Sequence, residues 1–229
     1  MKNIIKVNIC FYILFLISIF TGNFKKFIII TLITIFHEIG HIIVSILFKF
    51  KIEKIVIVPF GLITIFNKPI NTKIYKDLII TLMGPLFQFL LFFIIKDEKV
   101  LSINYNLLLF NLIPIIPLDG SKLLNILFEL IFPLKFSYML SLFVSLFILF
   151  SFLKLNLTVI LVVLIYLINN IKYYKNFKIY FNKFLLERYL YDYNFKVIKV
   201  NKITSFKKYK KHIIKNTFER DFLRELFDI

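Results

Sequence analysis

Apolar residues along this chain gather in long stretches that are separated by short polar or basic segments. A helix needs about 20 mostly apolar residues to cross roughly 30 Å of hydrocarbon. The first stretch is short, but no small-residue cleavage signal follows it, so we expect it to remain as a membrane span. The pattern predicts an α-helical integral membrane protein with about six transmembrane helices, at residues 8–21, 26–48, 78–95, 101–117, 136–153 and 157–174.

The fourth stretch does not end cleanly. It runs into Pro114, Pro117, Asp119 and Gly120, and an apolar segment then resumes at residues 123–132. Helix-breaking residues at membrane depth are tolerated where the freed backbone is buried in protein or faces water. We therefore expect one broken or bent span here rather than two full crossings.

The segment between the second and third stretches has a different pattern. Residues 53–66, EKIVIVPFGLITIF, are rich in β-branched residues on both sides of Pro59-Phe60-Gly61, which predicts two short strands. We expect a membrane-associated β-hairpin between spans two and three. An exposed strand carrying Ile57 or Ile63 could pair with an extended substrate, and the alternative is a self-contained hairpin at the membrane interface.

Composition and charge narrow the class of protein. Of the 229 residues 59% are hydrophobic, whereas soluble domains average about 45–50%, so a soluble globular fold is excluded. The single cysteine excludes an internal disulfide framework. Lysines are more numerous in the terminal segments and in the 49–77 loop than on the opposite side. The positive-inside rule then predicts a multi-pass protein of the bacterial cell membrane with both termini in the cytoplasm.

After Lys172 the chain becomes richer in charged, mainly basic, residues. Residues 172–229 hold 15 Lys or Arg against 6 Asp or Glu, yet they retain aromatic and aliphatic residues. This end could dock on anionic lipid or on a partner, or it could simply be a basic cytosolic end that follows the positive-inside rule. We expect two parts, a membrane domain at 1–175 and a basic cytosolic C-terminal tail at 176–229.

Ionisable residues inside the apolar stretches are few, and they cluster. His37, Glu38 and His41 lie within five consecutive positions of the second stretch. A charged group at mid-membrane costs at least about 2.5–3.5 kcal/mol and is a functional hypothesis by default. On a helix both imidazoles project from one face, and HEIGH matches H-E-x-x-H, in which two His bind zinc and the Glu acts on water. The alternative is a chance match.

Catalytic zinc has three protein ligands and one open position, so a third ligand must come from elsewhere. Asp119 is the best candidate, because the irregular backbone of NLIPIIPLDG can aim its carboxylate inward. For Asp119 the alternative is a helix N-cap before residues 121–130. We expect Glu129 at a helix end or interface, and His212 in a solvated tail.

The combination of HEIGH with NLIPIIPLDG resembles the site-2 protease family of intramembrane zinc metalloproteases, and within it the stage IV sporulation protein FB branch. The resemblance implies that His37, His41 and Asp119 bind Zn2+ and that Glu38 is the catalytic residue. It also implies supporting roles for residues of the second motif and of GPLFQFLL, namely Asn111, Pro114, Pro117, Gly84 and Pro85. Gln88 stands where many relatives carry Asn.

The implied activity is hydrolysis of a peptide bond in or near the membrane segment of a membrane-associated protein, and a pro-sigma factor in sporulation is one such substrate. The implied partners are that substrate, the lipid bilayer and regulatory membrane proteins; no nucleic-acid partner is expected. Relatives of this branch commonly continue into a nucleotide-sensing domain, and we expect no complete one in the tail. The rival hypotheses are a metal transporter and a catalytically inactive membrane scaffold of the same family.

Overall fold

The computed structural model describes residues 5–58, 61–152, 157–214 and 216–227. The chain is mostly helical, as predicted, and it divides into two compact units. Unit 1 comprises Met1–Lys68 and Leu78–Leu112, and unit 2 comprises Pro69–Asp77 and Ile113–Ile229. The elements are, in chain order, β1 (Ile5–Val7), α1 (Ile9–Phe20), α2 (Phe24–Leu47), β2 (Lys51–Val58), β3 (Gly61–Asn67), α3 (Ile74–Ile94), α4 (Glu98–Leu112), α5 (Asp119–Ile131), α6 (Leu134–Phe152), α7 (Leu157–Leu190), β4 (Val197–Lys199), the 3-10 turn η1 (Ile203–Ser205), β5 (Lys211–Ile214), β6 (Thr217–Phe218) and α8 (Glu219–Phe227).

Three helices in the described part of the chain are long and apolar enough to cross a membrane, namely α2, α3 and α6. Within α1, Phe11–Phe20 is a shorter apolar helix. The count of six crossings and the cytoplasmic placement of both termini remain predictions.

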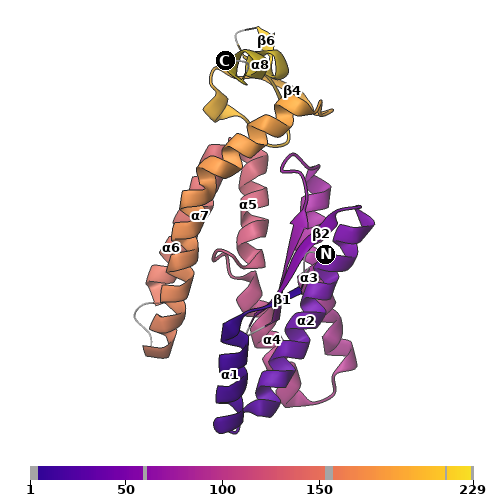
Figure 1. Ribbon diagram of the computed structural model, residues 1–229, viewed down its shortest axis with the longest axis vertical. Coiled ribbons are helices and arrows are strands. Elements are labelled where there is room, and N and C mark those ends of the chain that lie inside the picture. Colours follow the sequence, from indigo (N-terminus) through magenta and orange to yellow (C-terminus); the bar gives the residue numbers. More distant parts are fainter. Residues whose placement is uncertain (1–4, 59–60, 153–156, 215, 228–229) are drawn as a thin grey trace. The chain divides into compact units, whose positions relative to one another are not determined.

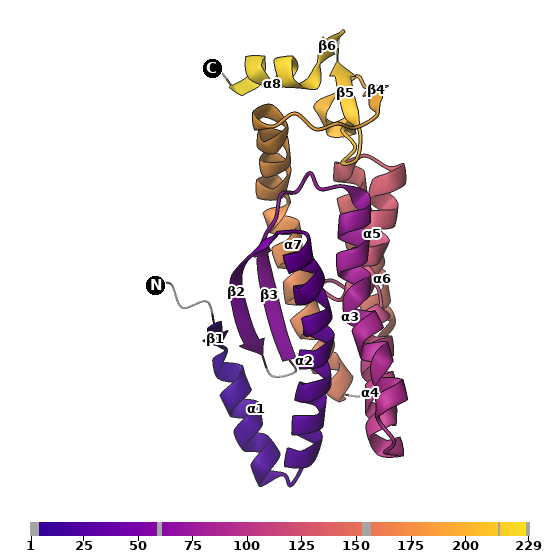
Figure 2. The same cartoon turned by 90° about the vertical axis from the view of Figure 1, so that its right-hand side faces the viewer.

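Unit 1 contains a three-stranded sheet in the order β1-β2-β3. The central strand β2 pairs antiparallel with β3 and parallel with β1. Strand β3 lies beside α2 (Figures 1 and 2). The two predicted strands are thus present and paired, while the predicted turn residues Pro59 and Phe60 lie outside the described residues. Association of this hairpin with the membrane remains a prediction.

A close contact between α2 and α3 depends on Gly40. A Cβ at this position would lie 2.3 Å from the carbonyl oxygen of Met83 and 3.0 Å from the Cβ of Phe87. Only a residue without a side chain allows the two backbones to approach this closely. Gly40 therefore serves helix packing in unit 1.

The predicted break after the fourth apolar stretch falls between α4 and α5, at residues 113–118. One backbone N–H group in this break has a side-chain hydrogen-bond partner: the N–H of Ile116 donates to Ser145 Oγ at 3.0 Å. Helix α5 begins at Asp119, and its N-cap is Leu118, with no side-chain cap hydrogen bond. The alternative that Asp119 is the N-cap is therefore wrong, because this residue already lies in the first helical turn.

In unit 2, α6 and α7 run side by side (Figure 1). Tyr138 of α6 stacks on Tyr173 of α7 with ring centroids 3.8 Å apart. Helix α7 continues to Leu190, well past the predicted end of the last span at residue 174. The basic tail that follows is folded, with a sheet in the order β4-β5-β6 and a core built from four nearly inaccessible side chains, Phe184, Phe206, Ile214 and Leu223.

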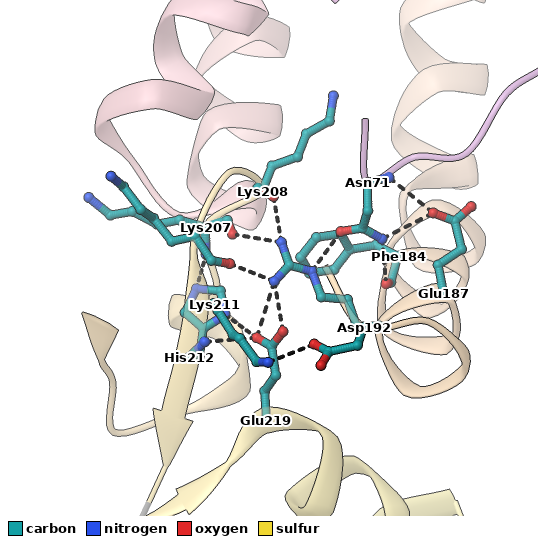
Figure 3. A network of polar contacts seen from close by, with 11 residues as sticks. Asn71, Phe184, Glu187, Asp192, Lys207, Lys208, Lys211, His212 and Glu219 are labelled. Carbon is teal, nitrogen blue, oxygen red and sulfur yellow. Dashed lines mark hydrogen bonds and ion pairs between the residues drawn. The ribbon is translucent and has the colours of Figure 1, made fainter. Parts of the chain in front are cut away.

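Buried polar contacts tie this tail to the end of α7 (Figure 3). Arg188 donates to Glu219 Oε1 at 2.9 Å and to Asn71 Oδ1 at 2.6 Å. Glu187, the residue before it, accepts the backbone N–H groups of Ile70 and Asn71. The loop before α3 is thereby fixed to α7 within the same unit.

His212 is not the solvated tail residue that the sequence predicted. It is fully buried, it accepts the Lys207 N–H at 2.9 Å, and its Nδ1 lies 2.7 Å from Glu219 Oε2. The prediction was wrong because β5 alternates between half-buried and buried positions, and His212 occupies a buried one. Its ring also stacks on Phe206, with centroids 4.2 Å apart.

Candidate metal centre

The two histidines of HEIGH lie one helical turn apart on α2, and both are buried, with 5% and 6% of their surface exposed. The Nε2 atom of His37 lies 3.2 Å from the Nε2 atom of His41. Both histidine rings therefore turn their Nε2 atoms toward the same point. Glu38, between them in the sequence, is half-buried.

The outer nitrogen of each ring faces a carbonyl oxygen. His37 Nδ1 lies 2.9 Å from Gln88 Oε1, and His41 Nδ1 lies 2.7 Å from the backbone oxygen of Ile80. A carbonyl oxygen can only accept, so each Nδ1 carries a proton, and in the neutral ring the lone pair is then on Nε2. In two neutral rings held this way the Nε2 lone pairs lie 3.2 Å apart and repel one another, and a shared cation removes that repulsion.

Gly84 of α3 provides the space at this point. A Cβ on Gly84 would lie 2.2 Å from His41 Nε2 and 2.7 Å from His37 Nε2. Any side chain at this position would occupy the volume in front of the two nitrogens. Pro85, which follows it inside α3, is buried as well.

Gln88 connects this ring pair to α4. Its amide nitrogen donates to the backbone oxygen of Asn104 at 3.1 Å, and the Asn104 side-chain nitrogen lies 3.4 Å from the backbone oxygen of Gln88. Neither side chain is accessible to solvent. The sequence marked Gln88 as a departure from relatives without assigning it a role, and only the three-dimensional structure reveals its contact with His37.

Asp119 is also buried, with 5% of its surface exposed, in the first turn of α5. Its Oδ1 lies 2.7 Å from the Nζ of Lys122, whose side chain is 54% exposed. Among the residues that the structure describes, His37, His41 and Asp119 form a group that could hold a metal ion, with one ligand atom from each. Two imidazoles and one carboxylate are a ligand set of catalytic zinc, so the residues present fit the ion that the sequence predicts.

The remaining residues that were predicted to support the site differ in how much of their surface is buried. Asn111 near the end of α4 is half-buried, as is Pro114 in the 113–118 connection, whereas Pro117 is exposed. Ile57 is on the central strand β2, and Ile63 is on β3. These five residues remain predicted supporting positions.

Glu129 was expected at a helix end or interface. It does lie in the last turn of α5, but it is almost fully buried. Lys208 and Tyr209 contact its carboxylate at 3.0 and 3.1 Å. It therefore belongs to an internal ion pair of unit 2.

A scan against protein-family models finds no family model that matches this chain. The chain is 28% identical to stage IV sporulation protein FB from Bacillus subtilis (strain 168) over 137 residues, which cover 55% of this chain and 48% of that protein. It therefore spans about half the length of this relative. The structure resembles that of the site-2 protease from Methanocaldococcus jannaschii, with a TM-score of 0.56 and 25% sequence identity over 73% of this chain and 89% of that one.

The helical fold with its apolar helices and the HEIGH pair, together with this structural likeness, places the chain among proteins similar to the site-2 protease family of membrane proteins. The similarity to stage IV sporulation protein FB confirms the resemblance to that branch found in the sequence.

Proposed function

We propose that this protein is an intramembrane zinc metalloprotease that hydrolyses a peptide bond in or near the membrane segment of a membrane-associated protein. The observation that carries the proposal is the pair of buried imidazoles, each with its Nδ1 on a carbonyl oxygen and with the two Nε2 atoms 3.2 Å apart. Two neutral rings held in this way turn their Nε2 lone pairs toward one another beside Gly84, and a shared cation makes that arrangement favourable.

In this proposal His37, His41 and Asp119 hold the ion, and Asp119 is its third protein ligand. Zinc bound in such a site acts as a Lewis acid and makes water acidic enough to lose a proton near neutral pH. The Lys122 partner of Asp119 is largely exposed. Lys122 can therefore turn into solvent when the carboxylate takes up a metal, without leaving a buried charge behind.

Glu38 is proposed as the general base and acid. It would accept the proton of the attacking water and deliver it to the leaving amine of the cleaved peptide bond. Its position between the two histidines on the same helix supports this role, since α2 fixes all three backbone positions.

The substrate peptide must be extended at the cleavage point, because a helix hides its peptide bonds in internal hydrogen bonds. We propose that it pairs with the unit 1 sheet by strand addition. In the described part of that sheet β2 already has a partner on both sides, which makes β3, with Ile63, a better candidate than β2, with Ile57. We also propose a pro-sigma factor in sporulation as one substrate and regulatory membrane proteins as partners; the similarity to a sporulation protein supports the link to sporulation.

The test is to co-express the protein with candidate membrane-tethered pro-proteins and to compare wild type with Glu38→Gln. The expected result is that Glu38→Gln stops cleavage while the purified variant retains its zinc. Glu98→Gln, at an exposed position in the first turn of α4, is the matched control and should cleave like wild type. Cleavage that persists in Glu38→Gln removes Glu38 as the base, and a wild type that binds zinc but cleaves no candidate favours the scaffold hypothesis.

A further inference from the structure

We infer that Gln88 is a positioning residue that holds His37 in the tautomer with its proton on Nδ1, so that Nε2 is always available to a metal. The inference rests on the proposed function in one respect, namely that His37 is a ligand. The observation behind the inference does not depend on any ion: His37 Nδ1 lies 2.9 Å from Gln88 Oε1, and both residues are buried in unit 1.

The orientation of the Gln88 amide follows from its second contact. The amide group lies between His37 Nδ1 and the backbone oxygen of Asn104, which is 3.1 Å from Nε2. A backbone oxygen can only accept a hydrogen bond. If the amide were reversed, two carbonyl oxygens would face one another in a buried site, which is unfavourable. The amide oxygen must therefore point to His37.

The orientation of the Gln88 amide in turn determines where the imidazole ring of His37 carries its proton. Because Gln88 Oε1 only accepts, His37 Nδ1 must donate, and the neutral ring then has no proton on Nε2. Asn104 thereby fixes Gln88, and Gln88 fixes His37, in one chain of donors and acceptors from α4 through α3 to α2. Ring partners of this kind set the tautomer and raise the basicity of a metal-binding histidine.

The two histidines differ in how they are held. His41 donates to the backbone oxygen of Ile80, which no substitution of a side chain removes. His37 depends on a side chain, and that side chain has no exposed surface through which water could replace it. Gln88 is therefore the position in unit 1 at which a substitution can change the tautomer of one ligand and leave the other unchanged.

The protein is favourable for a direct test because it has only three histidines. We would label the full-length protein with 15N-histidine, remove metal with a chelator, and record long-range 1H–15N correlations at a pH where imidazoles are neutral. In wild type we expect His37 with its proton on Nδ1. In Gln88→Leu we expect that signature to be lost or mixed with the other tautomer. Gln88→Glu should retain it, because its protonated carboxyl group can donate to the Asn104 oxygen and still accept from Nδ1.

His212 is the internal control. Its Nε2 accepts the Lys207 N–H, and its Nδ1 faces Glu219, so its tautomer has an independent cause within unit 2. It should be the same in all variants. Zinc affinity measured by chelator competition should fall about 10- to 100-fold in Gln88→Leu and much less in Gln88→Glu.

The inference is overturned if folded Gln88→Leu keeps the Nδ1–H form of His37. Should the leucine variant not fold, Gln88→Asn decides in the same way, because it keeps a buried amide but is one methylene too short to reach the ring. A metal-free wild type in which His37 is not locked on Nδ1 also overturns it, even if that protein cleaves substrate. Conversely, a locked His37 in a protein that binds no zinc contradicts the proposed function alone.

Discussion

Lys208 of the C-terminal tail lies 3.0 Å from the carboxylate of Glu129 at the end of α5, and both side chains are buried. The same ammonium group lies 2.9 Å from Asp77 in the first turn of α3. Burial alone would lower the pKa of Lys208, but Glu129, Tyr180 and Asp77 raise it well above its ordinary value. Lys208 is therefore charged, and it links the tail to two helices within unit 2.

Replacing this cation should loosen the tail. We expect Lys208→Met to destabilise unit 2, since removal of one partner of a buried ion pair typically costs about 3–5 kcal/mol. The measurement is limited proteolysis of the protein in detergent, together with hydrogen exchange across residues 191–227. Both should show earlier opening of the tail than in wild type.

Lys202→Met is the matched control for this change, because Lys202 is an exposed lysine of the same tail. It removes the same charge and should leave the protection of the tail unchanged. Equal protection of Lys208→Met and Lys202→Met would show that the buried ion pair contributes nothing to the fold of unit 2.

The tail should also lose stability on acidification. Burial lowers the pKa of His212 below its ordinary value of 6.5. The unfolded state then binds more protons than the folded state as pH falls through about 6.5, so the free energy of unfolding decreases. Burial alone would raise the pKa of Glu219, but its hydrogen bond with His212 and the charge of Arg188 lower it below 4.5. Its contribution is present above pH 4.5 and is lost below it.

This pH dependence can be divided between the two groups. In His212→Gln, whose amide can still donate to Glu219, we expect the loss between pH 7 and 5 to disappear and the loss near pH 4 to remain. Hydrogen exchange of the β5 amides, corrected for the intrinsic effect of pH, measures both. The same decline between pH 7 and 5 in His212→Gln would exclude His212 as its cause.

The sequence was informative where one local pattern determines the structure. The apolar stretches predicted the positions of α2, α3 and α6, the β-branched segment predicted β2 and β3, and the i, i+4 spacing predicted that His37 and His41 share a face. Pro114 and Pro117 predicted the break before α5. In each case the determining residues lie within a few positions of one another.

What sequence patterns did not reveal depends on contacts between distant residues. Gln88 is 51 positions from His37, and Lys208 is 131 positions from Asp77. A charged tail looks solvated in sequence, because nothing local indicates that Lys208 and His212 find buried carboxylates. The many lysines of the chain gave no indication that Lys208 is almost inaccessible to solvent.

Gly84→Ala should abolish metal binding while the protein still folds. The added Cβ would lie 2.2 Å from His41 Nε2 and 2.7 Å from His37 Nε2, so the rings must move away from the point at which they converge. Zinc content per protein after desalting is the measurement. Gly40→Ala is the informative comparison, because there the new Cβ meets the Met83 carbonyl and Phe87 instead. It should lower thermal stability through helix packing, and a wild-type zinc content in Gly84→Ala would refute the role of Gly84 in leaving space for the ion.

The assignment of Asp119 is tested through its neighbour Lys122, since the two form an ion pair across one turn of α5. If Asp119 is a zinc ligand, Asp119→Ala must lower the zinc-to-protein ratio, as must His37→Ala, because either change leaves two of three protein ligands. Lys122→Met removes only the exposed partner and leaves the carboxylate in place, so it should retain zinc at the wild-type ratio. If Asp119 merely pairs with Lys122 to support the first turn of α5, both substitutions would instead reduce thermal stability by similar small amounts and leave zinc unchanged. Full metal retention by Asp119→Ala would thus assign this residue to the helix and require a different third ligand.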